Sequence, residues 1–315
     1  MCKNEANVDL SYNRGSVTLK HSWVDRDELR IVLEKVSTPN KTVIITVINE
    51  AYVEPYPSMF DLFLEGFWIG EKTRPLLRHL LVVSMDKTAH ERCRFRRLNC
   101  YLLTAEEEGG GGNGIAGEKL YMSEEFIEMM WRRTAFLLGV LKRGYNFIFT
   151  DTDIIWVRNP FSKLMNNDGL DLQISTDRFT NDPLTYDRRI NTGFYYIRSS
   201  NKTTSFFKKW YDTRSNATGM KEQDVLQMLI SEMGALREFN ITIRYLDTKY
   251  FSGFCRDSPD AGSVITVHAN CCRTIKAKLV DLKAVFMDLK RFNVGNSSSN
   301  FRWSPHMACA KSRNT

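Results

Sequence analysis

The sequence predicts an α/β domain, in which the strands of a central sheet alternate with helices along the chain. Short, almost wholly apolar runs recur and end in polar residues, which is typical of buried strands. Between them lie segments whose apolar residues repeat at the spacing of an amphipathic helix. With 315 residues, of which 43% are hydrophobic, the chain is long enough to bury one large core or two closely joined ones.

The first half of the chain gives the clearest alternation. We predict, in order, a helix at 27–36, a strand at 43–48, a helix at 59–69, a strand at 80–85, a helix at 123–142 and a strand at 147–149. Ser123 is a favourable N-cap for the long helix, and Gly144 is suited to end it. Residues 1–22 predict a polar, loose arm, which with the first helix makes an amino-terminal region of residues 1–40. The glycine-rich stretch 106–117 predicts an exposed loop.

The second half continues the same pattern. We predict a strand at 172–175, an aromatic strand after residue 193, helices at 203–213 and 222–232, a strand at 264–267 and a closing helix at 279–289. The serine- and asparagine-rich segment 293–315 predicts a disordered tail. The main domain is therefore expected to span residues 41–292.

Two aspartates leave the central apolar strand. Asp151 and Asp153 follow residues 147–149 closely, and residues two apart in extended chain point to the same side. Two such carboxylates repel each other unless a cation lies between them, and hard oxygen ligands suit Mg²⁺ or Mn²⁺. Asp25 and Asp27 have the same spacing, but they precede an amphipathic segment and predict a helix start. Ligands of open α/β sheets bind beyond the carboxyl ends of strands, which favours a metal site at Asp151 and Asp153 over a capped turn.

Polar residues at two other strand ends are further candidates. His268 follows the strand at 264–267 and is either a third metal ligand or a structural histidine. Lys278, ten residues later, is suited to neutralise a diphosphate. Thr46 and Asn49, at the end of the first strand, are candidates for contact with a nucleotide base or ribose, with a turn-forming role for Asn49 as the alternative.

Two arginines on the long helix are candidates for ligand binding. Either Arg132 or Arg133 faces the ligand while the other is solvated, or both are surface residues. Asn191 and Gly193 precede the aromatic strand, where a glycine lets the backbone approach a ligand closely.

Gln223 and Asp224 begin the helix at 222–232. An acid in this first turn is favoured by the helix dipole, so a capping role for Asp224 competes with a catalytic one.

The charge distribution restricts the class of ligand. A net charge of +7 and a pI near 9.0 suit an anionic ligand such as a nucleotide-sugar. The basic residues are dispersed, and no zinc-finger or RNA-recognition signature is present, so we expect no nucleic-acid partner. No run approaches the roughly 18 apolar residues of a membrane span, and the first forty residues lack the apolar core of a signal peptide, so we expect no transmembrane segment in this chain.

The cysteines and glycosylation sequons bear on the compartment. Seven cysteines contain no CxxC pair, which makes a zinc site unfavourable. Cys93 with Cys100, and Cys255 with either Cys271 or Cys272, are possible disulfides, with buried free thiols as the alternative. Five Asn-x-Ser/Thr sequons favour a secretory lumen.

Several segments resemble a known family when taken together and in order. They are RRTAFLLGVLKRGYNFIFTDTDIIWVRNPF, INTGFYYIRSSNKTTSFFKKWYDTR, EQDVLQMLI, YLDTKYFSGFC and VHANCCRTIKAKLVDL. They resemble the plant nucleotide-diphospho-sugar transferase domain, the group of rhamnogalacturonan xylosyltransferases and extensin arabinosyltransferases. The resemblance extends over about residues 41–292.

The resemblance implies a GT-A, Rossmann-like fold with a central mixed sheet flanked by helices, and residence in the Golgi lumen. It implies a retaining transfer of a pentose or hexose from a UDP-sugar donor to a cell-wall polysaccharide or glycoprotein, with Mn²⁺ or Mg²⁺ as cofactor. Asp151 and Asp153 match the family's DxD motif, and His268 and Lys278 match its carboxyl-terminal His and Lys. Two alternatives remain: a haloacid-dehalogenase-type phosphatase with Asp151 as nucleophile, and a sugar-nucleotide-binding relative that has lost catalysis.

Overall fold

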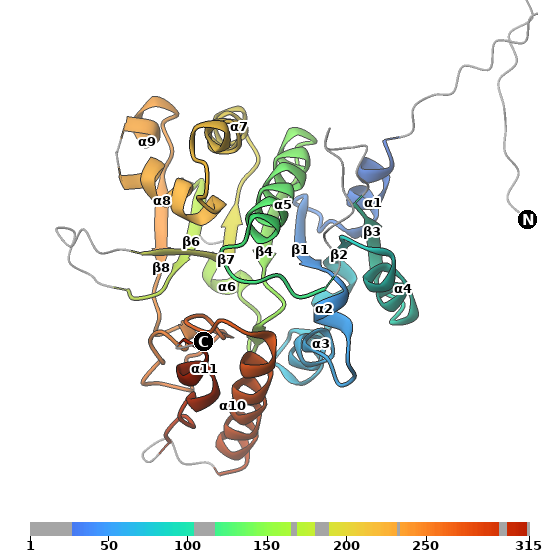
Figure 1. The fold of residues 1–315 in the computed structure, drawn as a ribbon, viewed down its shortest axis with the longest axis vertical. Helices are drawn as coiled ribbons and strands as arrows, with labels where there is room; N and C mark the ends of the chain where they lie inside the picture. The colour runs from blue at the N-terminus through green and yellow to red at the C-terminus, as the bar shows by residue number, and fades with distance from the viewer. Residues whose placement is uncertain are drawn as a thin grey trace, which may run out of the picture.

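The computed structural model describes residues 27–103, 117–164, 169–179, 189–231, 234–295 and 301–313. The predicted arm at 1–22 and all but the last residue of the predicted loop at 106–117 lie outside these residues. Within them, the chain alternates strands and helices as predicted (Figure 1).

A seven-stranded sheet forms the centre of the molecule. Its order is β3-β2-β1-β4-β7-β6-β8. The strands are β1 (Thr42–Ile48), β2 (Leu80–Ser84), β3 (Asn99–Leu102), β4 (Asn146–Thr150), β6 (Leu172–Thr176), β7 (Ile190–Ile197) and β8 (Ile243–Leu246). Only β7 runs antiparallel to its neighbours β4 and β6, so the sheet is mixed, as expected.

Helices cover both faces of this sheet. They are α1 (Glu28–Val36), α2 (Glu50–Val53), α3 (Met59–Ile69), α4 (Lys87–Phe95), α5 (Glu124–Lys142), α6 (Phe161–Leu164), α7 (Asn201–Thr213), α8 (Glu222–Ser231), α9 (Gly234–Glu238), α10 (Ile275–Gly295) and α11 (Met307–Ser312), with 3-10 turns η1 (Arg74–His79) and η3 (Arg214–Asn216). Side chains alternate across β1, so Val43 and Ile45 join the core that includes Leu137 of α5, while Ile44 and Ile48 join the core that includes Phe63 of α3.

Most predicted helix boundaries are close to those observed, but the closing helix predicted at 279–289 is longer: α10 covers residues 275–295 and extends past the predicted end of the domain at residue 292. The Ser123 hydroxyl caps α5 by accepting the Phe126 N–H, and Gly144 follows the helix with a φ of +80°, as expected of a helix-ending glycine. Asp27 accepts the Arg30 N–H and caps α1, so the second aspartate pair does mark a helix start. Two strand predictions were wrong: residues 191–193 lie within β7 and do not precede it, and His268 is the last residue of β10 and does not follow it.

A second, smaller sheet extends the fold towards the carboxyl end. It contains β5 (Ile154–Trp156), β10 (Thr266–His268) and β9 (Phe251–Gly253), in the order β5-β10-β9. We call it the small sheet. It packs with α10 and α11 around a third hydrophobic core, and these two helices lie side by side at the lower end of Figure 1.

The carboxyl-terminal segment corrects the prediction of a disordered tail. Residues 307–312 form α11, and Cys309 within it is fully buried and joined to Cys272 by a disulfide. Two further disulfides join Cys93 to Cys100, and Cys255 to Cys271. Of the two partners that the sequence allows for Cys255, Cys271 forms the disulfide, and Cys272 is bonded to Cys309 of α11. No described helix combines the length and apolarity needed to cross a bilayer.

Candidate functional site

Asp151 and Asp153 lie at the turn between the two sheets. The Asp151 N–H donates to the Gly193 carbonyl at 2.7 Å, which extends the pairing of β4 with β7 by one residue. The chain then turns into β5, and the Asp153 carbonyl accepts the Ala269 N–H at 3.1 Å. That bond holds the end of β10, and therefore His268, beside Asp153.

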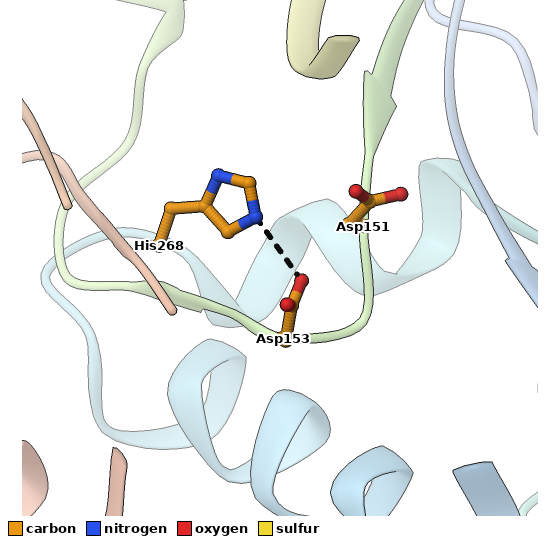
Figure 2. A group of neighbouring side chains, drawn as sticks. All are labelled: Asp151, Asp153 and His268. Atoms are coloured by element: carbon orange, nitrogen blue, oxygen red, sulfur yellow. Dashed lines mark ion pairs between the residues drawn. The ribbon is translucent and has the colours of Figure 1, made fainter. Parts of the chain in front are cut away.

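The three predicted metal ligands face a common space (Figure 2). Asp151, Asp153 and His268 each offer one ligand atom, and these atoms lie within 4.8 Å of one another. We call these side chains the Asp–Asp–His group. His268 Nε2 lies 3.3 Å from Asp153 Oδ1, and Lys278 Nζ, from the first turns of α10, lies 2.7 Å from Asp153 Oδ2. The predicted approach of the strand-end aspartates and histidine is therefore observed.

Gly193 makes this close approach possible. A Cβ at this position would lie 2.4 Å from His268 Cε1 and 2.7 Å from Asp151 Oδ2, both far inside van der Waals contact. Its N–H donates to Asn191 Oδ1 at 2.8 Å. Only a residue without a side chain fits between β7 and the Asp–Asp–His group.

The two carboxylates differ in their electrostatic surroundings. Burial acts to raise the pKa of Asp153, but Lys278 and His268 outweigh it and hold that pKa well below its usual value. For Asp151, burial and the nearby Asp153 raise the pKa in spite of Arg133. The pKa of His268 is also raised, because the two carboxylates outweigh its burial. The group therefore attracts positive charge, whether a proton or a metal ion.

Comparison with known proteins identifies the family. The family described as nucleotide-diphospho-sugar transferase matches residues 75–282, about two thirds of the chain. The chain belongs to the nucleotide-diphospho-sugar transferase family. It is therefore a glycosyltransferase that uses a sugar-nucleotide donor and a glycan acceptor, and the phosphatase interpretation was wrong.

Individual relatives of this transferase differ in sequence identity and in the fraction of their length that aligns with this chain. An uncharacterized Arabidopsis thaliana protein is 52% identical over 97% of this chain and 90% of the relative. Beta-arabinofuranosyltransferase RAY1 of the same plant is 25% identical over 75% of this chain, which spans only 45% of that relative. Among solved structures, mouse xyloside xylosyltransferase 1 is 13% identical, with a TM-score of 0.43 over 73% of this chain and 98% of the mouse chain.

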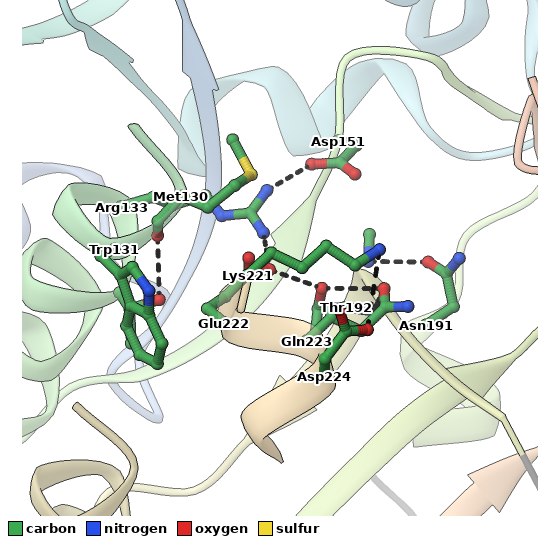
Figure 3. A network of polar contacts seen from close by, with 12 residues as sticks. Met130, Trp131, Arg133, Asp151, Asn191, Thr192, Lys221, Glu222, Gln223 and Asp224 are labelled. Atoms are coloured by element: carbon green, nitrogen blue, oxygen red, sulfur yellow. Dashed lines mark hydrogen bonds and ion pairs between the residues drawn. The ribbon is translucent and has the colours of Figure 1, made fainter. Parts of the chain in front are cut away.

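In this transferase, Arg133 connects the Asp–Asp–His group to α8 (Figure 3). Its guanidinium donates to Asp151 Oδ1 at 2.9 Å and to Glu222 Oε1 at 2.5 Å, and it lies 4.6 Å from the centre of the Phe149 ring. Arg132 beside it is also buried. The expectation that one or both arginines are solvated was therefore wrong, because α5 is buried on a wider face than its sequence pattern indicated.

The residues that begin α8 have different surroundings. Gln223 Oε1 accepts the Thr192 N–H at 3.1 Å, which fixes that side chain against β7. Asp224 keeps 45% of its side chain exposed and lies 4.0 Å from Lys221. Its pKa is raised, chiefly by partial burial and in addition by Glu222. The catalytic role of Gln223 and Asp224 remains a prediction.

The candidate donor-binding residues of β1 and β7 are buried. Asn49 lies at the end of β1 and donates to the Gly117 carbonyl at 2.9 Å, so it connects β1 to the segment before α5. Thr46 points into the protein with no exposed surface. Asn191 donates to Asp177 Oδ1 at 2.9 Å, and Asn270 donates to the same oxygen.

Two residues beside the site had no signal in the sequence. Glu222 is almost fully buried and balances Arg133, but it precedes the predicted pair Gln223 and Asp224 and appeared to be an ordinary first-turn acid. Tyr52 belongs to the short helix α2. Burial raises the pKa of Tyr52 to about 12, although Lys278, the charged group with the largest effect, lowers that pKa. The sequence pattern predicts neither the contact of Glu222 with Arg133 nor the position of Tyr52 near Lys278, because each depends on how elements distant in the sequence pack together.

Proposed function

We propose that this glycosyltransferase uses a divalent cation, Mn²⁺ or Mg²⁺, bound by Asp151, Asp153 and His268. The observation that carries the proposal is the meeting of two carboxylates and one imidazole within 4.8 Å at the end of a central strand. Carboxylate and imidazole ligands suit Mn²⁺, and carboxylates alone suit Mg²⁺. When bound, such an ion supplies Lewis-acid stabilisation of the departing diphosphate.

The chain's own residues would then orient the donor and balance its charge. Lys278 Nζ, 2.7 Å from Asp153, adds a fixed positive charge for the diphosphate. Gly193 lets His268 and Asp151 lie close to β7, and Arg133 holds Asp151 in place. Asn191 and Gly193 remain candidates for contact with the donor sugar. Asn49 and Arg132 remain candidates for contact with the nucleotide, whereas Thr46 has no exposed surface and is no longer a candidate.

The proposed transfer retains the configuration of the sugar. Retention needs either a nucleophile on the face opposite the acceptor or attack from the same face. Gln223 is fixed against β7, and Asp224 is partly exposed with a raised pKa, so these two residues are our candidates to assist the reaction.

The donor and acceptor are proposed from the resemblance and from one named relative. A UDP-sugar carrying a pentose or hexose, and a cell-wall polysaccharide or glycoprotein acceptor, follow from the resemblance to arabinosyl- and xylosyltransferases. A relative named as a beta-arabinofuranosyltransferase supports a pentose. Three disulfides support a lumen such as that of the Golgi, because the cytosol keeps thiols reduced.

The test is donor turnover with UDP-xylose, UDP-arabinose and UDP-galactose in the presence of Mn²⁺. The wild-type protein should turn over at least one donor, and Asp153→Ala should abolish turnover while the protein stays folded. Asp27→Ala is the matched control, because it removes the second acid of the other Asp-x-Asp pair. It loses a helix cap, worth about 1 kcal/mol, and a partly exposed ion pair with Arg143, neither of which belongs to the Asp–Asp–His group.

The two negative outcomes are distinct. Unchanged turnover in Asp153→Ala would remove the metal from the mechanism. Metal-dependent UDP binding by the wild type, without turnover of any donor, would favour the non-catalytic relative.

A further inference from the structure

A polar cavity lies at the far end of the small sheet from the Asp–Asp–His group. It has a volume of about 500 Å³, and Tyr250, Arg158 and Ile265 are among the residues that line it. His268 pairs with Ile154 and with Gly253 at one end of the small sheet. At the other end, the Ile265 carbonyl accepts the Arg158 N–H at 3.0 Å. We call this space the distal cavity.

The two sites are separated by the length of one short strand. Ile265 precedes His268 by three residues along β10, which corresponds to about 10 Å of extended backbone. Figure 2 shows β5 running from Asp153 away from Asp151 and past the strand that carries His268. No residue lining the distal cavity belongs to the proposed donor site, so the distal cavity can be tested independently.

The charge of the distal cavity favours an anion. Lys72, Arg158 and Lys163 line it together with a single carboxylate, that of Glu71. Three cations against one anion leave two net positive charges. Within the described part of the chain, Lys72 has no hydrogen-bond or ion-pair partner, and its backbone has the left-handed φ of +57° that non-glycine residues rarely adopt.

Arg158 is held in a fixed orientation. Its Nε lies 3.3 Å from Glu71 Oε2, and its Nη1 donates to the carbonyls of Ala261 and Val264 at 3.1 and 2.5 Å. A guanidinium fixed in this way loses little conformational entropy when a ligand binds. The side chain of Lys163 is exposed, and its Nζ lies 4.0 Å from the centre of the Tyr250 ring.

The other lining groups favour a saccharide over a phosphate ester. Tyr250 offers an aromatic ring, and Asn159 offers the N–H groups of its amide, which suit a ring with several hydroxyl groups. The Ser263 hydroxyl donates to Asp260 Oδ2 at 2.5 Å, so it is left to act as an acceptor. Phosphate sites commonly use free N–H groups at the start of a helix. Here the Phe161 N–H, the first of α6, already donates to Asn159 Oδ1 at 2.9 Å.

We propose that the distal cavity binds a saccharide unit that carries a carboxylate. Lys72 and Lys163 contact the carboxylate, Arg158 supplies a fixed positive charge, and Tyr250 packs against the sugar ring once Lys163 moves to the ligand. In a glycosyltransferase, such a site holds an acidic part of the glycan away from the reaction centre. That last role rests on the proposed function, whereas binding itself does not.

The experiment measures binding of trigalacturonate to the full chain by calorimetry, with its methyl ester as the neutral counterpart. We expect the acid to bind at least about tenfold more tightly than the ester, which corresponds to about 1.4 kcal/mol. Lys72→Ala combined with Lys163→Ala should remove that difference. Lys208→Ala is the control, since Lys208 is an exposed lysine of α7 whose ion-pair partner is Asp212 on the same helix.

Three results would overturn the proposal. They are equal affinity for acid and ester, unchanged affinity in the double lysine variant, and equally strong displacement of trigalacturonate by inorganic phosphate, which would indicate a simple anion site. Binding should survive in Asp153→Ala, so failure of the metal mechanism and failure of the distal cavity are separate outcomes. Thermal unfolding of each variant checks that the fold is intact.

Discussion

Gly193→Ala is the sharpest test of how the active site is assembled. The added Cβ would lie 2.4 Å from His268 Cε1, 2.7 Å from Asp151 Oδ2 and 2.9 Å from Asn191 Oδ1. Since ordinary contacts begin near 3.4 Å, His268 must move by about 1 Å or β7 must shift away from β4. Either movement separates the imidazole from the two carboxylates.

The expected losses follow from that displacement. A misplacement of about 1 Å in a catalytic group commonly lowers the rate by about 100-fold, which corresponds to about 2.7 kcal/mol of transition-state stabilisation. The overpacking itself should lower the free energy of unfolding by about 1–3 kcal/mol. The assays are donor turnover, Mn²⁺ affinity measured by electron paramagnetic resonance, and urea denaturation.

Gly139→Ala is the matched control for this substitution. A Cβ on Gly139 of α5 would meet its nearest neighbour at 3.4 Å, and alanine stabilises a helix relative to glycine by up to about 1 kcal/mol. We expect unchanged Mn²⁺ affinity and turnover in this variant. If Gly193→Ala keeps wild-type Mn²⁺ affinity and turnover, the Asp–Asp–His group does not bind the ion as a unit and the proposed assembly is refuted.

Three further predictions concern charge and covalent links. Glu222→Gln removes one of the two carboxylates that Arg133 contacts, while Asp151 remains, and should cost about 1–3 kcal/mol in urea denaturation. Glu34→Gln in the exposed pair with Arg30 should cost less than about 1 kcal/mol. Cys309→Ser removes the disulfide that holds α11 and should lower the free energy of unfolding by about 2–4 kcal/mol in the same assay. An unchanged free energy of unfolding would show that α11 stays packed without the disulfide. Mn²⁺ affinity should fall as the pH is lowered, because a proton competes with the ion for the His268 ring. The pKa of His268 is raised above 6.5, so the ring takes up that proton at a higher pH than a free imidazole does. An affinity that does not change between pH 8 and pH 5.5 would exclude His268 as a ligand.

Much of the fold could be predicted from the sequence because the central strands are buried on both faces. Such strands are continuous apolar runs, and β1 and β4 were therefore found within a residue or two. The helix α5 was found because Ser123 and Gly144 mark its two ends. In the same way, Asp151 and Asp153 stood out because polar residues at the end of a buried strand contrast with the run before them.

Contacts between distant segments could not be predicted in this way. Arg133 and Glu222 are 89 residues apart, and their pairing depends on how α8 packs beside α5. The Cys272–Cys309 disulfide likewise depends on the path of the tail, whose polar composition indicated disorder although one of its cysteines is buried. Local patterns report which face of an element is apolar, but they do not report which element covers it.

The charge balance of the site is the electrostatic argument for the proposed cation. Asp151, Asp153 and Glu222 contribute three negative charges, while Arg133 and Lys278 contribute two positive ones, which leaves one net negative charge when His268 is neutral. Glu222 is essential to this balance, because without it Arg133 and Lys278 would fully neutralise the two aspartates and a divalent ion would gain little by binding. A buried excess of negative charge is costly in a medium of low dielectric constant, and the raised pKa of Asp151 and His268 is one way of relieving it. The proposed divalent ion would relieve it more completely and would add positive charge for a departing diphosphate.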